Sequence, residues 1–409
     1  MESNGCSALS SNDSPQFQPL SCIERTLPVS RASCLTFSEG NKNHFRDIWT
    51  NRRRNMIHIN KTTLAIWSMS FLITASLNAE SPPTRKTASV EKSATLIKNN
   101  SIWRDTDGNT IWASLGGHIS KFGDTYYWVG TDPRKTDASI RLYSSKTLGS
   151  NTWKLEGFVD KRAPSLGRRN CTLLYCPKTK KYVIICKGIG FYQSKGSNVK
   201  GPYTYKKKIT AEKMNRKGYH TGGMSAYAEG ETAYIIVSMR KLDETRDRYC
   251  MIYELTPDFL SLKKEVLFMR VADKREAFWL FKKDKKYYMT YDGPGGWMGS
   301  DCYYRTADKL EGPWTEEKEI GMIPEPKNRK QRSHASQHRY IMNINGQWIY
   351  GGDRYPYQEP ESHPPENGLH IICPIEWDGE KPYVIWEDKW DISNYDSTRK
   401  AMQKGHLNR

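Results

Sequence analysis

From about residue 110 onward, polar turns alternate with short apolar runs that are rich in aromatic side chains. One unit recurs five times: a polar turn followed directly by a run of Tyr, Trp, Val and Ile. The copies are Gly123–Gly130, Lys178–Ile185, Glu229–Ile236, Lys283–Thr290 and Asn345–Tyr350. Each copy predicts a β-hairpin whose turn leads into an aromatic strand.

The spacing of these copies, about 50 to 60 residues, indicates the architecture. A repeat of this length is typical of the blades of a β-propeller, and helical periodicity is sparse. A β-sandwich, the alternative all-β fold, would not explain regular repetition at so long a period. We therefore predict an all-β, five-bladed β-propeller over residues 101–395.

Glu276 is the first candidate for chemistry in this propeller. Ligands of propellers bind over the central channel, so a polar residue near the first strand of each blade should face one mouth. Glu276 precedes the apolar run Ala277–Phe281 directly. An ionised carboxylate resists burial unless it is paired or functional. Two interpretations follow: a structural anion paired with Arg275, or an acid whose apolar surroundings let it hold a proton.

The first hundred residues are rich in Ser, Asn and Pro and show no sustained period. Residues 1–55 are predicted to be disordered, or to lie upstream of a true start at Met56. Residues 56–79 have the pattern of a secretory signal peptide, with a cationic start, an apolar stretch of about 14 residues and a small residue at the cut. That stretch is shorter than the ~20 residues of a membrane span, and a short anchor or a buried helix is the alternative.

These features predict a secreted or periplasmic protein without a stable membrane span. Residues 80–100 are expected to form a flexible leader, and residues 396–409 a C-terminal tail. Of the nine cysteines, six fall in the predicted domain, without CxxC or Cys/His metal spacing. We predict buried thiols, with a Cys171–Cys186 bridge as the alternative in an oxidising compartment.

The net charge of +18 favours an anionic partner. The lysine runs fall at predicted turns and strand ends, as they do on any solvated β surface, so we do not expect nucleic acid to bind. An anionic polysaccharide is the more informative alternative. No phosphate-binding Gly-rich loop and no His-Glu-x-x-His motif is present.

Several segments, taken together in their order and spacing, carry a family resemblance. They are Trp103–Ile111 leading to Gly116-Gly117 and Thr125–Trp128; Arg275–Ala277 with Lys286–Tyr288 and Gly296-Trp297; Ser336-Gln337; Tyr350–Arg354; and Pro374–Gly379 with Trp386 and Trp390. Over about residues 101–395 the chain resembles glycoside hydrolase family 43, in the branch that includes exo-β-1,3-galactanases.

The resemblance implies a five-bladed propeller that hydrolyses glycosidic bonds with inversion. Glu276 matches the general acid, and Gln337 matches a glutamine that replaces the usual base carboxylate and orients water. Residues expected to bind substrate are Trp128, Arg169, Trp297, Asp353 and Tyr355. The family allows a Ca²⁺ ion in the channel, although the sequence offers no dedicated loop for it, and no other cofactor or metal site is expected. We expect a monomer that acts on a polysaccharide or oligosaccharide.

The chain also departs from the family at expected active-site positions. Leu115 stands in place of a histidine, and Thr131 in place of a sugar-binding carboxylate. Arg169 stands where a glutamate is usual, which reverses a charge. Gly223 replaces the aspartate that positions the acid and sets its pKa, and general acid catalysis contributes typically ~10²- to 10⁴-fold.

Three hypotheses therefore remain from the sequence. The first is an active galactanase-like glycosidase with Glu276 and Gln337 at its centre. The second is a propeller that has lost turnover and binds carbohydrate. The third is a hydrolase adapted to an anionic glycan, for which Arg169, His118 and His220 are the motivating residues. Asp105 and Asp107 are interpreted as turn formers, and the scattered histidines His118, His220, His334 and His338 as ordinary hydrogen-bonded residues.

Overall fold

The computed structural model describes residues 94–114, 116–132, 139–161, 169–243, 247–293, 295, 299–356 and 367–395. The upstream segment 1–55, the predicted signal peptide 56–79, most of the predicted leader and the tail 396–409 lie outside the described residues. No helix within the described ranges is long and apolar enough to cross a membrane.

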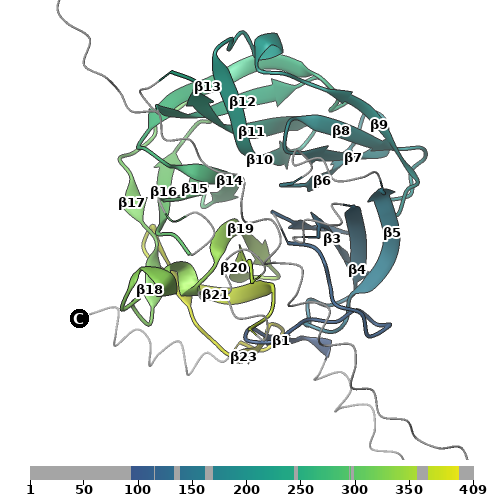
Figure 1. Cartoon of the computed structure of the whole chain (residues 1–409), viewed down its shortest axis with the longest axis vertical. Coiled ribbons are helices and arrows are strands. Elements are labelled where there is room, and N and C mark those ends of the chain that lie inside the picture. Colours follow the sequence, from purple (N-terminus) through teal and green to yellow (C-terminus); the bar gives the residue numbers. More distant parts are fainter. Residues whose placement is uncertain are drawn as a thin grey trace, which may run out of the picture. The chain divides into compact units, whose positions relative to one another are not determined.

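Five sheets surround one axis, as Figure 1 shows, and the predicted all-β five-bladed propeller is confirmed. Blade 1 holds β2 (His118–Phe122), β3 (Thr125–Thr131), β4 (Ile140–Ser145) and β5 (Lys154–Asp160). Blade 2 holds β6 (Thr172–Cys176), β7 (Lys181–Cys186), β8 (Gly190–Ser194) and β9 (Tyr203–Lys208). Blade 3 holds β10 (Tyr219–Glu229), β11 (Thr232–Lys241), β12 (Arg248–Leu255) and β13 (Leu262–Val271). Blade 4 holds β14 (Glu276–Lys283), β15 (Lys286–Asp292), β16 (Cys302–Ala307) and β17 (Lys318–Glu319).

Blade 5 has the same four-stranded plan with one addition. Its antiparallel strands are β19 (Gln337–Ile344), β20 (Gln347–Asp353), β21 (His370–Asp378) and β22 (Lys381–Ile385), and β18 (Gly321–Ile323) joins β22 in parallel. Two short 3₁₀ helices are described, η1 (Glu212–Met214) and η2 (Arg329–His334).

The five predicted hairpins are the turns between the first two strands of the five blades. In blade 4 the turn residues Asp284 and Lys285 have φ of 50° and 68°, and in blade 5 Asn345 and Gly346 have 50° and 94°. Two-residue turns with positive φ at both positions match the right-handed twist of the flanking strands. The polar turn residues of the repeat therefore set the register of blades 4 and 5.

Each hydrophobic cluster of the propeller fills the boundary between two neighbouring blades. Leu173 and Ile184 of blade 2, for example, pack against Val129 of blade 1. The run after Glu276 follows the same rule: Phe278 and Leu280 belong to the cluster between blades 3 and 4. Both faces of a blade are thus buried, which explains why the first strands read as nearly continuous apolar runs.

The two ends of the domain meet in a separate small sheet. Strand β1 (Leu96–Lys98) pairs with β23 (Lys389–Asp391), and buried Asn99 hydrogen-bonds the backbone of Ile372 in both directions, at 3.0 and 2.8 Å. The ordered domain therefore begins before residue 101. Residues 96–98, at the end of the predicted leader over 80–100, form strand β1 and complete the seam between blades 5 and 1.

The six cysteines of the domain are all buried, as predicted. Cys171 and Cys186 lie on the neighbouring strands at the start of blade 2, with their Sγ atoms 2.9 Å apart.

Candidate active site

A small cavity lies where the first strands of blades 2 to 5 begin. Its lining residues are Arg169, Asn170, Lys187, Gly223, Glu276, Ala277, Gln337, Arg339 and Tyr355. Glu276 and Gln337 are the first residues of β14 and β19, so the fold brings together two sites that are far apart in sequence. Of the predicted site residues, Arg169, Glu276, Gln337 and Tyr355 line this one cavity.

A β-bulge sets the position of Glu276 at the cavity. The register between β14 and β15 shifts between Glu276 and Trp279, and Ala277 inside this bulge has φ of 58°. Bulges of this kind re-aim side chains next to functional sites, and left-handed backbone at a non-glycine residue is uncommon. The strand can therefore bury Phe278 between blades while Glu276 reaches the cavity.

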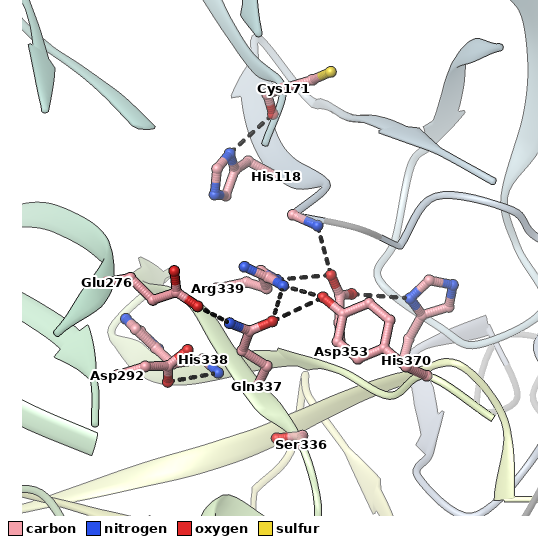
Figure 2. A network of polar contacts seen from close by, with 12 residues as sticks. His118, Cys171, Glu276, Asp292, Ser336, Gln337, His338, Arg339, Asp353 and His370 are labelled. Atoms are coloured by element: carbon pink, nitrogen blue, oxygen red, sulfur yellow. Dashed lines mark hydrogen bonds and ion pairs between the residues drawn. The ribbon is translucent and has the colours of Figure 1, made fainter. Parts of the chain in front are cut away.

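Arg275 does not neutralise Glu276. Its guanidinium makes two hydrogen bonds to the carboxylate of Glu317, at 3.0 and 2.6 Å, and stacks on the ring of Tyr303. The interpretation of Glu276 as a structural anion paired with Arg275 is therefore wrong. Within the described residues, Glu276 Oε1 accepts the Nε2 amide of Gln337 at 3.5 Å, as Figure 2 shows.

The side-chain amide of Gln337 has a fixed orientation. Its Oε1 accepts from Arg339 Nη2 and, at 3.1 Å, from the Tyr355 hydroxyl. Because a guanidinium can only donate, the oxygen must face Arg339 and the Nε2 group must face Glu276. The oxygen of Gln337 is fully used, so this residue can hold a water by donating to it but cannot take its proton.

Arg339 is the buried centre of this network. Its Nε donates to Asp353 Oδ2 at 2.8 Å, and Nη2 donates to both Gln337 and Tyr355. Burial disfavours the charged guanidinium, but Tyr355 and Asp353 outweigh it and raise the pKa of Arg339. Asp353 also accepts the backbone N–H of Gly116 at 2.7 Å and faces His370. Asp353 does not line the cavity and supports Arg339 from behind it, so its predicted substrate-binding role stays a prediction.

Asp292 is a second carboxyl group near Glu276, and the sequence analysis did not select it. It lies opposite Glu276 across the β14–β15 pair, is fully buried, and its Oδ1 accepts from the backbone N–H of His338 at 3.1 Å. Its Oδ2 has no hydrogen-bond partner among the described residues. Burial raises the pKa of Asp292 to about 8, and the nearby charge of Glu276 acts in the same direction. Asp292 is thus largely protonated at neutral pH.

Two histidines lie in the wall beneath the cavity and stay neutral. Burial, with the charge of Arg339 second, lowers the pKa of His118 to about 4 and that of His338 to about 3. His118 Nδ1 bonds the Cys171 carbonyl at 2.9 Å, and His338 Nε2 bonds Thr290 Oγ1 at 2.9 Å. No group of three His, Cys, Asp or Glu side chains gathers as a metal site within the described ranges. These residues offer no cage for the Ca²⁺ ion that the resemblance allows.

The blade 2 and blade 3 side of the cavity is cationic. Arg169 precedes β6 and Lys187 lies in the β7–β8 turn, and burial lowers the pKa of both side chains. Glu276 opposes this effect at Lys187, which places the two charges within electrostatic reach. Gly223 of β10 faces the same space, and a Cβ atom there would meet nothing closer than the Ala277 nitrogen at 3.6 Å.

Two further positions lie away from the cavity, and a third is outside the described residues. Trp128 is 2% exposed and packs on Trp103 and Trp153 in the core between blades 5 and 1, and it does not line the cavity. Strand β3 is buried on both faces, so its aromatic residues fill blade boundaries. Trp297 falls outside the described residues. Thr131 ends β3, is buried, and does not line the cavity.

Comparisons with known proteins agree with this geometry. The model of glycosyl hydrolases family 43 matches residues 117–382. The exo-β-1,3-galactanase of Phanerochaete chrysosporium, solved with β-1,3-galactotriose, is 21% identical, with 73% of this chain and 68% of that chain covered and a TM-score of 0.60. The exo-β-1,3-galactanase of Clostridium thermocellum is 23% identical, with 73% and 67% covered and a TM-score of 0.60.

A third similar structure is matched over its whole chain. It is a family 43 β-1,3-galactosidase with galactodeoxynojirimycin, 23% identical, with 72% of this chain and 100% of that chain covered and a TM-score of 0.56. At these identities the likeness shows the fold. A search of curated proteins finds no match.

Proposed function

Because the chain belongs to glycosyl hydrolases family 43, we propose that it hydrolyses glycosidic bonds of a galactan-type polysaccharide, with inversion and with Glu276 as general acid. The observation that carries the proposal is the convergence of Glu276 and Gln337, from the starts of β14 and β19, on one cavity. The similar structures named above, which include two exo-β-1,3-galactanases, support the choice of galactan.

In this mechanism the two oxygens of Glu276 have different tasks. Oε1 accepts the Gln337 amide, which holds the carboxyl group in place, and Oε2 carries the proton that passes to the leaving oxygen. The buried Arg339 fixes Gln337 in turn. A chain of hydrogen bonds, in which Arg339 donates to Asp353 and Gln337 and Gln337 donates to Glu276, therefore positions the acid from blade 5.

Gln337 can position the attacking water by donating a hydrogen bond to it. Its second Nε2–H can hold a water by the water's oxygen. An amide is no base, and its carbonyl oxygen is occupied by Arg339 and Tyr355. The proton of the attacking water must then leave to the substrate or to solvent.

The predicted signal sequence in residues 56–79 supports a further part of the proposal, that the enzyme acts outside the cytosol. An extracellular location suits a polymeric substrate.

The proposal is tested by hydrolysis of β-1,3-galactan, arabinan and aryl glycosides, with wild type compared with Glu276→Gln. We expect wild type to release sugar from the galactan with inverted anomeric configuration, read by NMR. Glu276→Gln should be slower by about 10²- to 10⁴-fold. Glu231→Gln, an exposed substitution in the β10–β11 turn, removes the same charge and should leave the rate unchanged.

A second function is favoured by one observation. No side-chain carboxylate other than that of Glu276 lines the described cavity, and Gly223 leaves room where the family carries an aspartate. We therefore keep a carbohydrate-binding propeller without turnover as the alternative. Equal, near-zero rates for wild type and Glu276→Gln, with galactan still bound by both, would establish that alternative.

A further inference from the structure

Blade 3 rises beyond its neighbour at the mouth of the propeller. Its first two strands have 11 and 10 residues, whereas the first two strands of blade 2 have 5 and 6. A register shift between Thr221 and Met224 separates the extension from the rest of β10. Beyond Gly223, which lines the cavity, the blade therefore continues outward as a wall.

That wall carries three basic residues side by side. His220 of β10 pairs with Arg240 of β11, and Arg240 pairs with Arg248 of β12. Residues directly opposite each other on neighbouring strands project from the same face of the sheet. Because strands lie ~4.8 Å apart, the row from His220 to Arg248 spans roughly 10 Å, which corresponds to a short oligosaccharide.

Lys187 connects this row to the cavity. After burial, the positive charges of Lys187, Arg240 and Arg248 lower the pKa of His220, so each of the three lies within electrostatic reach of His220. Lys187 also lines the cavity beside Glu276. We define Lys187, His220, Arg240 and Arg248 as the cationic row; it begins at the candidate acid and ends in blade 3.

The protein itself leaves this charge largely unbalanced. Within the described residues, no hydrogen bond or ion pair engages the Arg240 guanidinium or the Lys187 ammonium, and buried Nε of Arg248 has no hydrogen-bond partner. Asp247, which precedes Arg248 in the chain, pairs with Arg270 at 2.8 Å. Like charges placed directly opposite each other destabilise a sheet, so a structural role does not explain their alignment.

We propose that the cationic row binds the sulfate or carboxylate groups of an anionic polysaccharide whose terminal sugar lies beside Glu276. The guanidinium groups of Arg240 and Arg248 offer forked donors that match either anion. The proposal rests on the proposed function, because it gives that site's substrate an anionic character. Nucleic acid is the less suitable ligand, since the row is short, lies on one sheet and leads into a narrow cavity.

The experiment measures binding in the Glu276→Gln background, so that no ligand is consumed during isothermal titration. The probes are a sulfated galactan oligosaccharide, the same oligosaccharide after desulfation, a galacturonate oligomer and a short DNA duplex. The test variant is Arg240→Ala/Arg248→Ala. The control is Lys206→Ala/Lys208→Ala, which removes the same charge from exposed positions of β9 in blade 2. Arg240→Gln, at an exposed position, is the second test if the double variant fails to fold.

We expect one of the anionic oligosaccharides to bind at least about 10-fold more tightly than the desulfated one, and the better one identifies sulfate or carboxylate as the ligand group. The test variant should lose about 10-fold in affinity for it, the control less than about 2-fold, and added salt should weaken binding. The proposal is overturned if the desulfated oligosaccharide binds as tightly, if the test variant and control behave alike, or if DNA binds more tightly than every sugar.

The outcome is separable from that of the proposed function. If wild type cleaves neutral galactan and shows no preference for anionic sugars, the proposed role of the cationic row is wrong and the proposed hydrolase activity stands. If wild type binds an anionic sugar tightly through the cationic row but never cleaves it, the proposed role of the row stands and the proposed hydrolase activity is wrong.

Discussion

The two sides of the cavity are built on opposite plans. On the blade 5 side, buried Arg339 donates to Asp353 and Gln337 (Figure 2), and also to Tyr355. On the blade 2 and blade 3 side, the Lys187 ammonium has no hydrogen bond or ion pair within the described ranges, and Gly223 contributes no side chain. One side holds the acid rigidly, and the other leaves charge and space for a ligand. One small site can thus combine a rigidly held acid with a ligand-binding side whose charge and space are open.

The largest effect is expected from disrupting the hydrogen-bond network of Arg339 on the blade 5 side. Arg339→Met would leave Asp353 buried with an uncompensated charge, which costs about 3–5 kcal/mol of the free energy of unfolding. Lys187→Met, on the cationic side, should change it by less than about 1 kcal/mol. Urea unfolding of both variants measures the contrast, and Arg339→Met/Asp353→Asn should recover part of the loss. Similar destabilisation by Arg339→Met and Lys187→Met would show that the two sides do not differ.

A comparable effect is expected from the pH dependence of stability. The pKa of Asp292 is about 8 in the folded protein and about 4 when unfolded, so its neutral form is favoured by folding. This contribution is fully present below pH ~4 and is lost as the pH rises through about 8. Asp292→Asn, which cannot ionise, should remove that decline. Urea midpoints between pH 5 and 9, given as wild type minus variant, measure it, and parallel profiles would contradict the assignment.

The smallest effect is expected from a substitution that adds a side chain at Gly223, on the blade 2 and blade 3 side of the cavity. Gly223→Asp has room, with 3.6 Å to the nearest atom from its Cβ, and would place a carboxylate beside Glu276 and Lys187. We expect about 10-fold higher kcat/KM on neutral galactan and a weaker preference for anionic sugars, because the new charge competes for the cations. Gly223→Asn has nearly the same shape without the charge. If the Asn variant changes kcat/KM as much as the Asp variant, charge is not the cause.

The sequence carried enough local information to predict the architecture. The five hairpins are encoded by turn residues next to aromatic strands, and both signals act over a few residues. Glu276 and Gln337 could be selected because each stands at the start of a blade's first strand, where the propeller plan makes side chains converge. These predictions required only the repeat and a family pattern.

What the sequence could not give is the identity of the partners across blades. Lys187 and Asp292 each sit inside or next to an ordinary strand pattern, and their importance arises from neighbours in other blades, as in the bond from His338 to Asp292 across 46 residues. The partners of Arg339 lie within 16 residues of it, but only the folded blade shows that they are Asp353, Gln337 and Tyr355. Trp128 illustrates a different difficulty. It lies on a strand that is buried on both faces, and the sequence of such a strand does not show which aromatic residues face a cleft and which lie in the core. A polar residue at a strand end, as Asp292 is, would have been the usable clue.

The seam made by β1, β23 and Asn99 has a consequence for the order of folding. Asn99 contacts Ile372 across a sequence separation of 273 residues, whereas the first hairpin of each blade closes over a turn of two or four residues. Long-range contacts form late because their loop-closure entropy must be met first. We therefore expect individual blades to form early and the ring to close last, with the Ile372 amide, which donates to Asn99, gaining protection late in pulsed hydrogen exchange. Early protection of that amide would contradict this order. Until the ring closes, blade 5 and its Gln337 are not yet fixed opposite blades 2 and 3, so the complete site would be among the last features that the folding chain acquires.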